Sequence, residues 1–285
     1  MFVATTPEEA LPIIRSIDVL FGWKVPEVVL EAGVNLRWFQ SMGAGVDDVI
    51  PHALHLNDVR VTRVVDQFGV AISEFVFAHL LYHVKSLKRT MSAQRSHRWE
   101  GFTTETLAGK MLGVAGLGSI GRVITKTART FGMNVSGLSL HAAKHDDLDL
   151  HFLPTDWAMF AAQVDYLVLT LPLTEKTRHV IDETLLGCMK STAWLVNVGR
   201  GGLVDTAALV RWLQQNRLGG AVLDVFEEEP LSSENVLWDL PNVYITPHIS
   251  GPSQTDDVAN FFIENLARYE SSGSLRGVVN LQLGY

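Results

Sequence analysis

The stretch Met111–Gly121, MLGVAGLGSIG, decides the fold of this chain. Its first five residues form the apolar run of a buried parallel strand, and Gly116–Gly121 is a GxGxxG turn at the start of a helix. In such a turn the first glycine permits a tight bend, the second leaves room for a pyrophosphate, and the third lets helix and strand approach closely. The helix N-terminus offers N–H groups and a partial positive charge to the pyrophosphate. The turn therefore predicts a dinucleotide site formed by Gly116, Gly118, Ser119, Ile120 and Gly121.

Short apolar runs recur along the chain and alternate with helical patterns. The expected strands are Met111–Ala115, Val135–Leu140, Tyr166–Leu171, Trp194–Val198, Ala221–Val225 and Val243–Ile245. The helical patterns between them include a face formed by Ile120, Ile124 and Ala128 and a helix that Asp205 can cap. Repeated strand–helix–strand units predict an α/β fold with a doubly wound parallel sheet and helices on both faces.

The first part of the chain has weaker strand candidates, at Val19–Phe21 and Leu36–Phe39, and we expect a smaller α/β lobe there. A helical pattern from Ser73, a plausible N-cap, to about Arg95 would lead into the sheet domain. The apolar face of Asp256–Tyr269 predicts a helix that returns to the first lobe. The small lobe is then discontinuous. We assign residues 1–83 and 257–285 to it and residues 84–256 to the NAD(P)-binding domain.

Composition and charge argue against several classes of function. A hydrophobic share of 47% and a charged share of 19% are those of an ordinary globular protein. The formal net charge of -8, without a basic stripe, argues against a nucleic-acid partner. No apolar run approaches the roughly 18 to 20 residues that span a bilayer. The first residues lack a secretory signal, and the single Cys188 excludes an internal disulfide, so we expect a cytoplasmic protein.

The residues after the second expected strand bear on the choice of cofactor. A carboxylate roughly 20 residues after the glycine turn ordinarily binds the ribose 2′-hydroxyl of NAD. Here the strand ends in Ser139-Leu140-His141, without an acid, and Lys144 follows closely. Ser139, His141 and Lys144 can accommodate a 2′-phosphate, so NAD(P) is expected with NADP slightly favoured over NAD. If these are only solvated loop residues, either cofactor fits.

Charged residues stand at the ends of three successive expected strands, where the active sites of parallel sheets gather. They are Arg200, Asp224 with Glu229, and His248. The planar fork of an arginine suits a substrate carboxylate, and a histidine exchanges protons near neutral pH. A carboxylate bound to the imidazole fixes its tautomer and stabilises the protonated form. We therefore expect Arg200, Glu229 and His248 to reduce a 2-oxo acid, with a nicotinamide as hydride donor.

These residues resemble those of the D-isomer-specific 2-hydroxyacid dehydrogenases, a family that includes glyoxylate/hydroxypyruvate reductases, phosphoglycerate dehydrogenases and formate dehydrogenases. The resemblance covers nearly the whole chain, through GLGSIG, LTLPLTEKTRHVI, VNVGRGGLVD, DVFEEEPL and LPNVYITPHISG in the family's order and spacing. It implies that Arg200 binds substrate, that His248 donates the proton, and that Glu229 is the partner of His248. It also implies cofactor contacts at Leu171, Pro172, Thr177, Val198, Gly199, Asp224, which would bind the carboxamide, and Gly251.

The resemblance extends to the first lobe, which it identifies as a flavodoxin-like substrate-binding domain. Backbone N–H groups of Met42, Gly43, Ala44 and Gly45 would cradle the substrate carboxylate, together with Arg200 and His248 as substrate-binding side chains. The segment WFQSMGAGVD is similar to the glyoxylate/hydroxypyruvate reductase branch. Because the chain begins late by the family's standard, we expect the first strand and helix of this lobe to be missing or shortened. A homodimer is expected from the resemblance as well.

Other interpretations remain open for the same residues. Transcriptional corepressors of this family bind nucleotides and can keep the catalytic residues, so a nucleotide-sensing module without turnover is the alternative to an enzyme. A methyltransferase would use the glycine turn but leave Arg200, Glu229 and His248 unexplained, and each of the three alone has an ordinary structural explanation. No metal site is expected. Zinc requires three or four protein ligands, and no nearby Cys or carboxylate completes such a set with His79 and His83.

Overall fold

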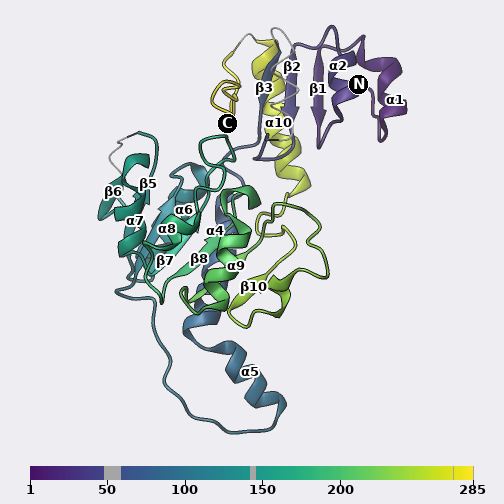
Figure 1. Cartoon of the computed structure of the whole chain (residues 1–285). Coiled ribbons are helices and arrows are strands. Elements are labelled where there is room, and N and C mark those ends of the chain that lie inside the picture. Colours follow the sequence, from purple (N-terminus) through teal and green to yellow (C-terminus); the bar gives the residue numbers. More distant parts are fainter. Residues whose placement is uncertain (48–58, 142–145, 272, 285) are drawn as a thin grey trace. The chain divides into compact units, whose positions relative to one another are not determined.

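The computed structural model describes residues 1–47, 59–141, 146–271 and 273–284. The chain divides into two compact units, one formed by Met1–Phe68 with Ser253–Tyr285 and the other by Gly69–Pro252. Both units have a parallel sheet with helices packed against it (Figure 1), so the expected α/β class is confirmed. In the part of the chain that the structure describes, no helix is both long and apolar enough to cross a membrane.

The larger unit contains a seven-stranded sheet in which every neighbouring pair is parallel. Its strands are β4 (Met111–Ala115), β5 (Asn134–Leu138), β6 (Leu150–Phe152), β7 (Tyr166–Leu169), β8 (Trp194–Asn197), β9 (Gly220–Leu223) and β10 (Val243–Ile245). The order β10-β9-β8-β7-β4-β5-β6 reverses direction at β4, which places a topological switch point between β4 and β7. The doubly wound sheet predicted from the alternation is therefore confirmed. Strand β6 was not expected, because its sequence, LHF, has a histidine at its centre and does not form an apolar run.

Helices cover this sheet in two groups (Figure 1). The α-helices of the unit are α4 (Gly69–Val84), α5 (Leu87–Arg95), α6 (Ser119–Thr130), α7 (Trp157–Gln163), α8 (Glu183–Leu186) and α9 (Thr206–Gln214). Helix α4 packs on α6, whereas α7, α8 and α9 adjoin one another and enclose the main core with the sheet. Asp205 caps α9 as expected, since its carboxylate accepts from the N–H of Ala208 at 2.9 Å. Short 3-10 turns lie at Pro154–Asp156, Gly201–Leu203 and Val236–Asp239.

The single helix expected from Ser73 to Arg95 is wrong in two respects. Ser73 does not cap a helix but lies buried inside α4, where its hydroxyl bonds the Thr127 hydroxyl of α6 at 2.9 Å. The helix is also interrupted, because Ser86 has a φ of +49°, in the left-handed region. Helix α5 starts anew after this residue. A helical pattern that continues across a break of two residues, Lys85 and Ser86, cannot reveal the break by its periodicity.

The smaller unit has a three-stranded parallel sheet in the order β1-β2-β3. Its elements are α1 (Pro7–Ile14), β1 (Val19–Gly22), α2 (Glu27–Ala32), β2 (Trp38–Ser41), β3 (Arg60–Thr62) and α10 (Thr255–Glu270). A core of Leu30, Leu36, Phe39, Val46, Val59, Val61 and Val279 lies against the sheet. The two expected strands and the C-terminal helix are present, whereas β3 was missed, since its sequence, RVT, is not an apolar run.

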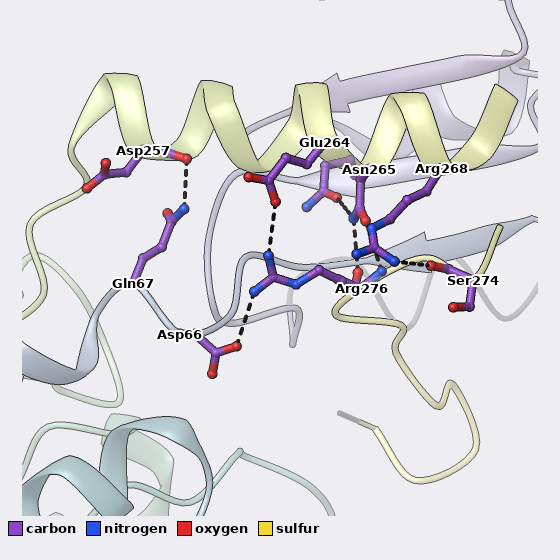
Figure 2. A network of polar contacts seen from close by, with 9 residues as sticks. Asp66, Gln67, Asp257, Glu264, Asn265, Arg268, Ser274 and Arg276 are labelled. Atoms are coloured by element: carbon purple, nitrogen blue, oxygen red, sulfur yellow. Dashed lines mark hydrogen bonds and ion pairs between the residues drawn. The ribbon is translucent and has the colours of Figure 1, made fainter. Parts of the chain in front are cut away.

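A polar network holds α10 within the smaller unit (Figure 2). Buried Asn265 donates to the Gln40 side chain and to the carbonyl of Arg276, both at 3.0 Å, and accepts from the N–H of Arg276 at 2.9 Å. The Arg276 guanidinium contacts Glu264 at 3.0 Å and Asp66 at 3.4 Å. The helix and the C-terminal segment are thus joined to β2 and to the residues after β3 by contacts between distant parts of the sequence.

Candidate active site

The turn between β4 and α6 has the shape that a dinucleotide requires. Gly116 has a φ of +103°, which side chains disfavour, and a Cβ on Gly121 would overlap the carbonyl oxygen of Gly116. A Cβ on Gly118, in contrast, would meet nothing within 4 Å, so this residue borders open space. Gly118 is the N-cap of α6 and brings no side chain to the helix N-terminus. The N–H groups of Ser119 and the next residues therefore fit a pyrophosphate.

The ends of the neighbouring strands meet at this turn. The N–H of Gly116 donates to the carbonyl of Leu138, at the end of β5, at 2.9 Å. The Thr170 hydroxyl, directly after β7, donates to the carbonyl of Gly116 at 2.7 Å. Ser139 follows β5 and is therefore close to the glycine turn. Sequence analysis missed Thr170; its only signal was a hydroxyl at the end of an apolar strand.

The expected cofactor residues after β7 and β8 also lie together. A Cβ on Gly199 would come within 3.0 Å of the carbonyl oxygen of Leu171, and the N–H of Val198 donates to the carbonyl of Leu169 at 3.3 Å. Thr177 fixes the loop after β7, since its hydroxyl donates to the carbonyl of Pro172 at 2.7 Å. His141 is exposed two residues after Ser139, and Lys144 lies outside the described residues. Gly251 follows the buried Ser250 in the segment after β10.

Arg200 is half-buried at the carboxyl end of β8. Its guanidinium donates to the carbonyl of Gly199 at 2.7 Å. The preceding Asn197 holds the bend, because its side chain donates to the carbonyl of Arg200 at 2.9 Å and accepts from the N–H of Gly199 at 3.1 Å. Asn197 is a positioning residue that sequence analysis missed. A fully buried amide at the end of an otherwise apolar strand was its available signal.

Asp224 holds the segment that carries His248. Its carboxylate is fully buried and accepts from the Thr246 hydroxyl at 2.6 Å and from the N–H groups of Ile249 and Ser250 at 2.9 Å. Its carbonyl accepts from the N–H of His248 at 2.8 Å. The backbone of His248 has a φ of +54°, a conformation that these bonds maintain. In addition to any contact with a carboxamide, Asp224 therefore positions the histidine.

Glu229 and His248 form a direct pair. Glu229 Oε2 lies 2.8 Å from His248 Nδ1, and Glu229 Oε1 accepts from the N–H of Phe226 at 3.0 Å. Gly201, next to Arg200, packs so closely on Phe226 that a Cβ there would overlap its backbone. The segments that carry the three expected catalytic residues are therefore adjacent. Because Nδ1 faces the carboxylate, Nε2 of the half-exposed imidazole is the nitrogen available to a substrate.

The expected substrate loop follows β2 in the smaller unit. The N–H of Met42 donates to the carbonyl of Gly22 at 3.1 Å, and that of Gly43 to the Ser41 hydroxyl at 3.2 Å. A Cβ on Gly43 would overlap the Trp23 ring, so the loop is packed against this indole. Two of the four N–H groups expected to bind a carboxylate thus have partners in the smaller unit, at the end of β1 and the end of β2.

The two spaced histidines of α4 have packing contacts. His79 Nδ1 lies 2.9 Å from the carbonyl oxygen of Phe75, and the His83 ring lies 4.0 Å from that of Trp194. Burial lowers the pKa of His83, because it penalises the charged form. Among the residues that the structure describes, no group of three His, Cys, Asp or Glu side chains is arranged to hold a metal ion.

Comparisons with known proteins agree with this geometry. Residues 77–250 match the model of the D-isomer specific 2-hydroxyacid dehydrogenase NAD-binding domain. The D-3-phosphoglycerate dehydrogenase of Methanocaldococcus jannaschii is 34% identical over 85% of this chain, which spans only 47% of that relative, about half its length. The glyoxylate reductase of Pyrococcus horikoshii is 32% identical to this chain, and the alignment covers 92% of this chain and 83% of that protein.

A solved structure shows the same likeness in three dimensions. The NADPH-dependent glyoxylate/hydroxypyruvate reductase of Sinorhizobium meliloti, in complex with NADP and sulfate, aligns with a TM-score of 0.87 and 30% identity. The alignment covers 95% of this chain and 87% of that protein. Together with the glycine turn and the Glu229–His248 pair, these matches establish that the chain belongs to the D-isomer specific 2-hydroxyacid dehydrogenase family, as an NAD(P)-dependent oxidoreductase with a Rossmann cofactor domain.

Proposed function

We propose that the chain reduces small 2-oxo acids, with glyoxylate and hydroxypyruvate as substrates, to the corresponding 2-hydroxy acids, in the D configuration where the product is chiral. The observation that carries this proposal is the 2.8 Å contact between Glu229 and His248 at the carboxyl edge of the sheet that also bears the glycine turn. Similar proteins named glyoxylate reductase and hydroxypyruvate reductase support the substrate class. They also make a nucleotide-sensing module without turnover the less favoured alternative.

Each catalytic side chain has a defined role in this proposal. When bound, the reduced nicotinamide supplies a hydride to the carbonyl carbon. Arg200 binds the substrate carboxylate and polarises the ketone, since its guanidinium donates in a fork that matches a carboxylate. His248 Nε2 gives the proton that turns the new alkoxide into a hydroxyl. Glu229 accepts from Nδ1, which fixes the tautomer and stabilises the imidazolium before the proton leaves.

The cofactor roles expected from the family are proposed for the residues along the same edge. Gly116, Gly118, Ser119, Ile120 and Gly121 bind the pyrophosphate, and Val198, Gly199 and Asp224 adjoin the nicotinamide. Leu171, Pro172, Thr177 and Gly251 line the remainder of the site. For the substrate we propose the N–H groups of Ala44 and Gly45 as carboxylate donors, in the loop that also contains Met42 and Gly43.

NADPH is the proposed cofactor in preference to NADH. The residues directly after β5, Ser139-Leu140-His141, include no carboxylate that would accept from a ribose 2′-hydroxyl. The similar reductase of Sinorhizobium meliloti is described as NADPH-dependent. A homodimer is proposed from the family resemblance, and a cytoplasmic location from the sequence alone; both stay predictions.

A steady-state assay tests the proposal. The purified chain is mixed with NADPH or NADH and with glyoxylate, hydroxypyruvate, pyruvate or phenylpyruvate, and oxidation of the cofactor is followed at 340 nm, the absorbance band of reduced nicotinamides. We expect saturable turnover with glyoxylate and hydroxypyruvate, and a higher kcat/KM with NADPH. Tight cofactor binding without turnover on any 2-oxo acid would overturn the enzyme proposal and favour the nucleotide-sensing alternative.

A further inference from the structure

The end of β5 holds a pair of polar side chains that the sequence did not connect. Strand β6 pairs with β5 in parallel, with His151 opposite Gly137 and Phe152 opposite Leu138. The N–H of Ser139 donates to the carbonyl of Phe152 at 3.2 Å, which continues the pairing past the end of β5. His151 is therefore brought to Ser139, with its Nε2 2.8 Å from the serine Oγ.

The Ser139 hydroxyl lies between two partners, the His141 carbonyl and His151 Nε2. The Ser139 hydroxyl has a single hydrogen, which it donates to the carbonyl of His141 at 3.1 Å. When it does so, the serine oxygen accepts from His151 in the tautomer whose Nε2 carries the hydrogen. This arrangement makes a chain of donors that runs from His151 through Ser139. A hydroxyl that accepts one hydrogen bond becomes a stronger donor in the next.

Asp149, the residue directly before β6, makes its contacts at the opposite end of the two strands. Asp149 accepts from the N–H of Val135, at the start of β5, at 2.8 Å and pairs with Arg129 at 2.7 Å. The Arg129 side chain and this N–H hold the pKa of Asp149 below its usual value. The segment thus places a carboxylate at the amino end of β5 and a pair of donors at its carboxyl end. The glycine turn is at the carboxyl end too, through the bond from Gly116 to Leu138.

We infer that Ser139 and His151 together recognise the 2′-phosphate of NADPH, and that His151 is a specificity-determining positioning residue. When the phosphate binds, the Ser139 hydroxyl turns its hydrogen from the carbonyl of His141 to a phosphate oxygen. His151 keeps donating to Ser139 and so holds the hydroxyl in the orientation that donates outward. A ribose 2′-hydroxyl, which seeks an acceptor, gains less from this pair than an anion does. The inference rests on the proposed cofactor site and specifies how that site distinguishes the two cofactors.

Binding of NADP⁺ and NAD⁺ by isothermal titration calorimetry tests the inference without turnover. Ser139→Ala removes the donor, His151→Leu removes its support, and His151→Gln keeps an N–H that can reach the serine. We expect Ser139→Ala and His151→Leu to weaken NADP⁺ binding at least about tenfold, the loss typical of one hydrogen bond to a charged group. NAD⁺ binding should change less than about threefold, and His151→Gln should stay within about threefold of the original protein for both.

A matched control is His97→Asn, which replaces an exposed histidine just after α5 at a φ of +51°, where asparagine is tolerated. It should leave both dissociation constants unchanged. Equal weakening of both cofactors in Ser139→Ala and His151→Leu, or His151→Gln behaving like His151→Leu, overturns the inference. If the unsubstituted chain binds neither cofactor, the proposed function itself fails, which is a different result. If His151→Leu does not fold, the Ser139→Ala and His151→Gln pair still decides.

Discussion

The two edges of the seven-stranded sheet use the same residue types in different ways. At the amino edge Asp165, just before β7, pairs with Lys190 at 2.8 Å and accepts from the N–H of Met111 at 2.8 Å. Burial opposes the charge of this carboxylate, but the bonds from Lys190 and Met111 outweigh it and keep the pKa of Asp165 below its usual value. At the carboxyl edge Glu229 instead bonds an imidazole whose second nitrogen is left for a substrate.

The difference teaches how to separate stabilising from functional charges. A carboxylate such as that of Asp165, whose oxygens are bound by a lysine and by a backbone N–H, stabilises the fold and stays ionised. Asp224, at the carboxyl edge, holds three donors of the segment Thr246–Ser250 and thereby fixes the backbone of a proton donor. Substitutions at the two edges should accordingly separate effects on turnover from effects on stability.

The largest expected effect is on turnover at the carboxyl edge. His248→Asn introduces a residue that tolerates the φ of +54° but cannot act as an acid near neutral pH. We expect kcat for glyoxylate to fall roughly 10²- to 10⁴-fold, the usual contribution of general acid–base catalysis. The dissociation constant of the cofactor, measured by calorimetry, should stay within about threefold. Turnover like that of the unsubstituted protein would break the comparison, because the histidine would then be structural.

The next effect couples both properties at one residue. Asp224→Asn replaces one carboxylate oxygen with an NH2 group, which cannot accept a hydrogen bond. The buried side chain then loses part of its bonding to the three donors that the carboxylate accepts from. We expect the free energy of unfolding in urea to fall by about 1.5–3 kcal/mol, the range for hydrogen bonds to a charged group. The kcat should fall as well, because the segment that carries His248 loses its anchor. A stable protein with an unchanged kcat would contradict the positioning role.

A smaller effect is expected at the amino edge, on stability alone. Asp165→Asn removes the ion pair with Lys190 but keeps an oxygen that can accept from the N–H of Met111. Because both charged side chains are partly exposed, the expected loss in the free energy of unfolding is about 1 kcal/mol. The kcat and KM should not change. A decrease in kcat without a decrease in stability would show that the amino edge also serves catalysis.

The smallest effect is a pH dependence at the amino edge. Arg129 and the N–H of Val135 lower the pKa of Asp149, so the folded state binds this proton less readily than the unfolded chain. Its contribution to stability is therefore present above the unfolded pKa of about 3.9 and is lost as the pH falls through the lower folded value. The difference in unfolding free energy between the unsubstituted chain and Asp149→Asn, measured by urea titration from pH 7 to pH 3, should shrink toward acid. A difference that stays constant over this range would rule out the linkage.

Most of the larger unit could be read from the sequence, since strand, glycine turn and helix follow one another within Met111–Thr130 and need no distant partner to be recognised. The expected charged residues also stand at strand ends that the sheet order brings to one edge. The bond between Asp224 and the segment after β10 could not be read in this way, because it joins residues that no local pattern relates. The same holds for Asn197, whose effect on Arg200 depends on a bend after β8.

The sequence by itself determined the local elements of this protein: the alternation of apolar runs and amphipathic helices, the glycine turn, and the charged residues that follow strands. These features depend on the conformational preferences and periodicity of neighbouring residues, which a linear chain displays directly. Only the tertiary structure decided that Ser86 interrupts a helix, that β3 and β6 complete the sheets, and that His151 meets Ser139. Such features arise from pairing and packing between distant segments, and the free energy of those contacts is not encoded in any single stretch.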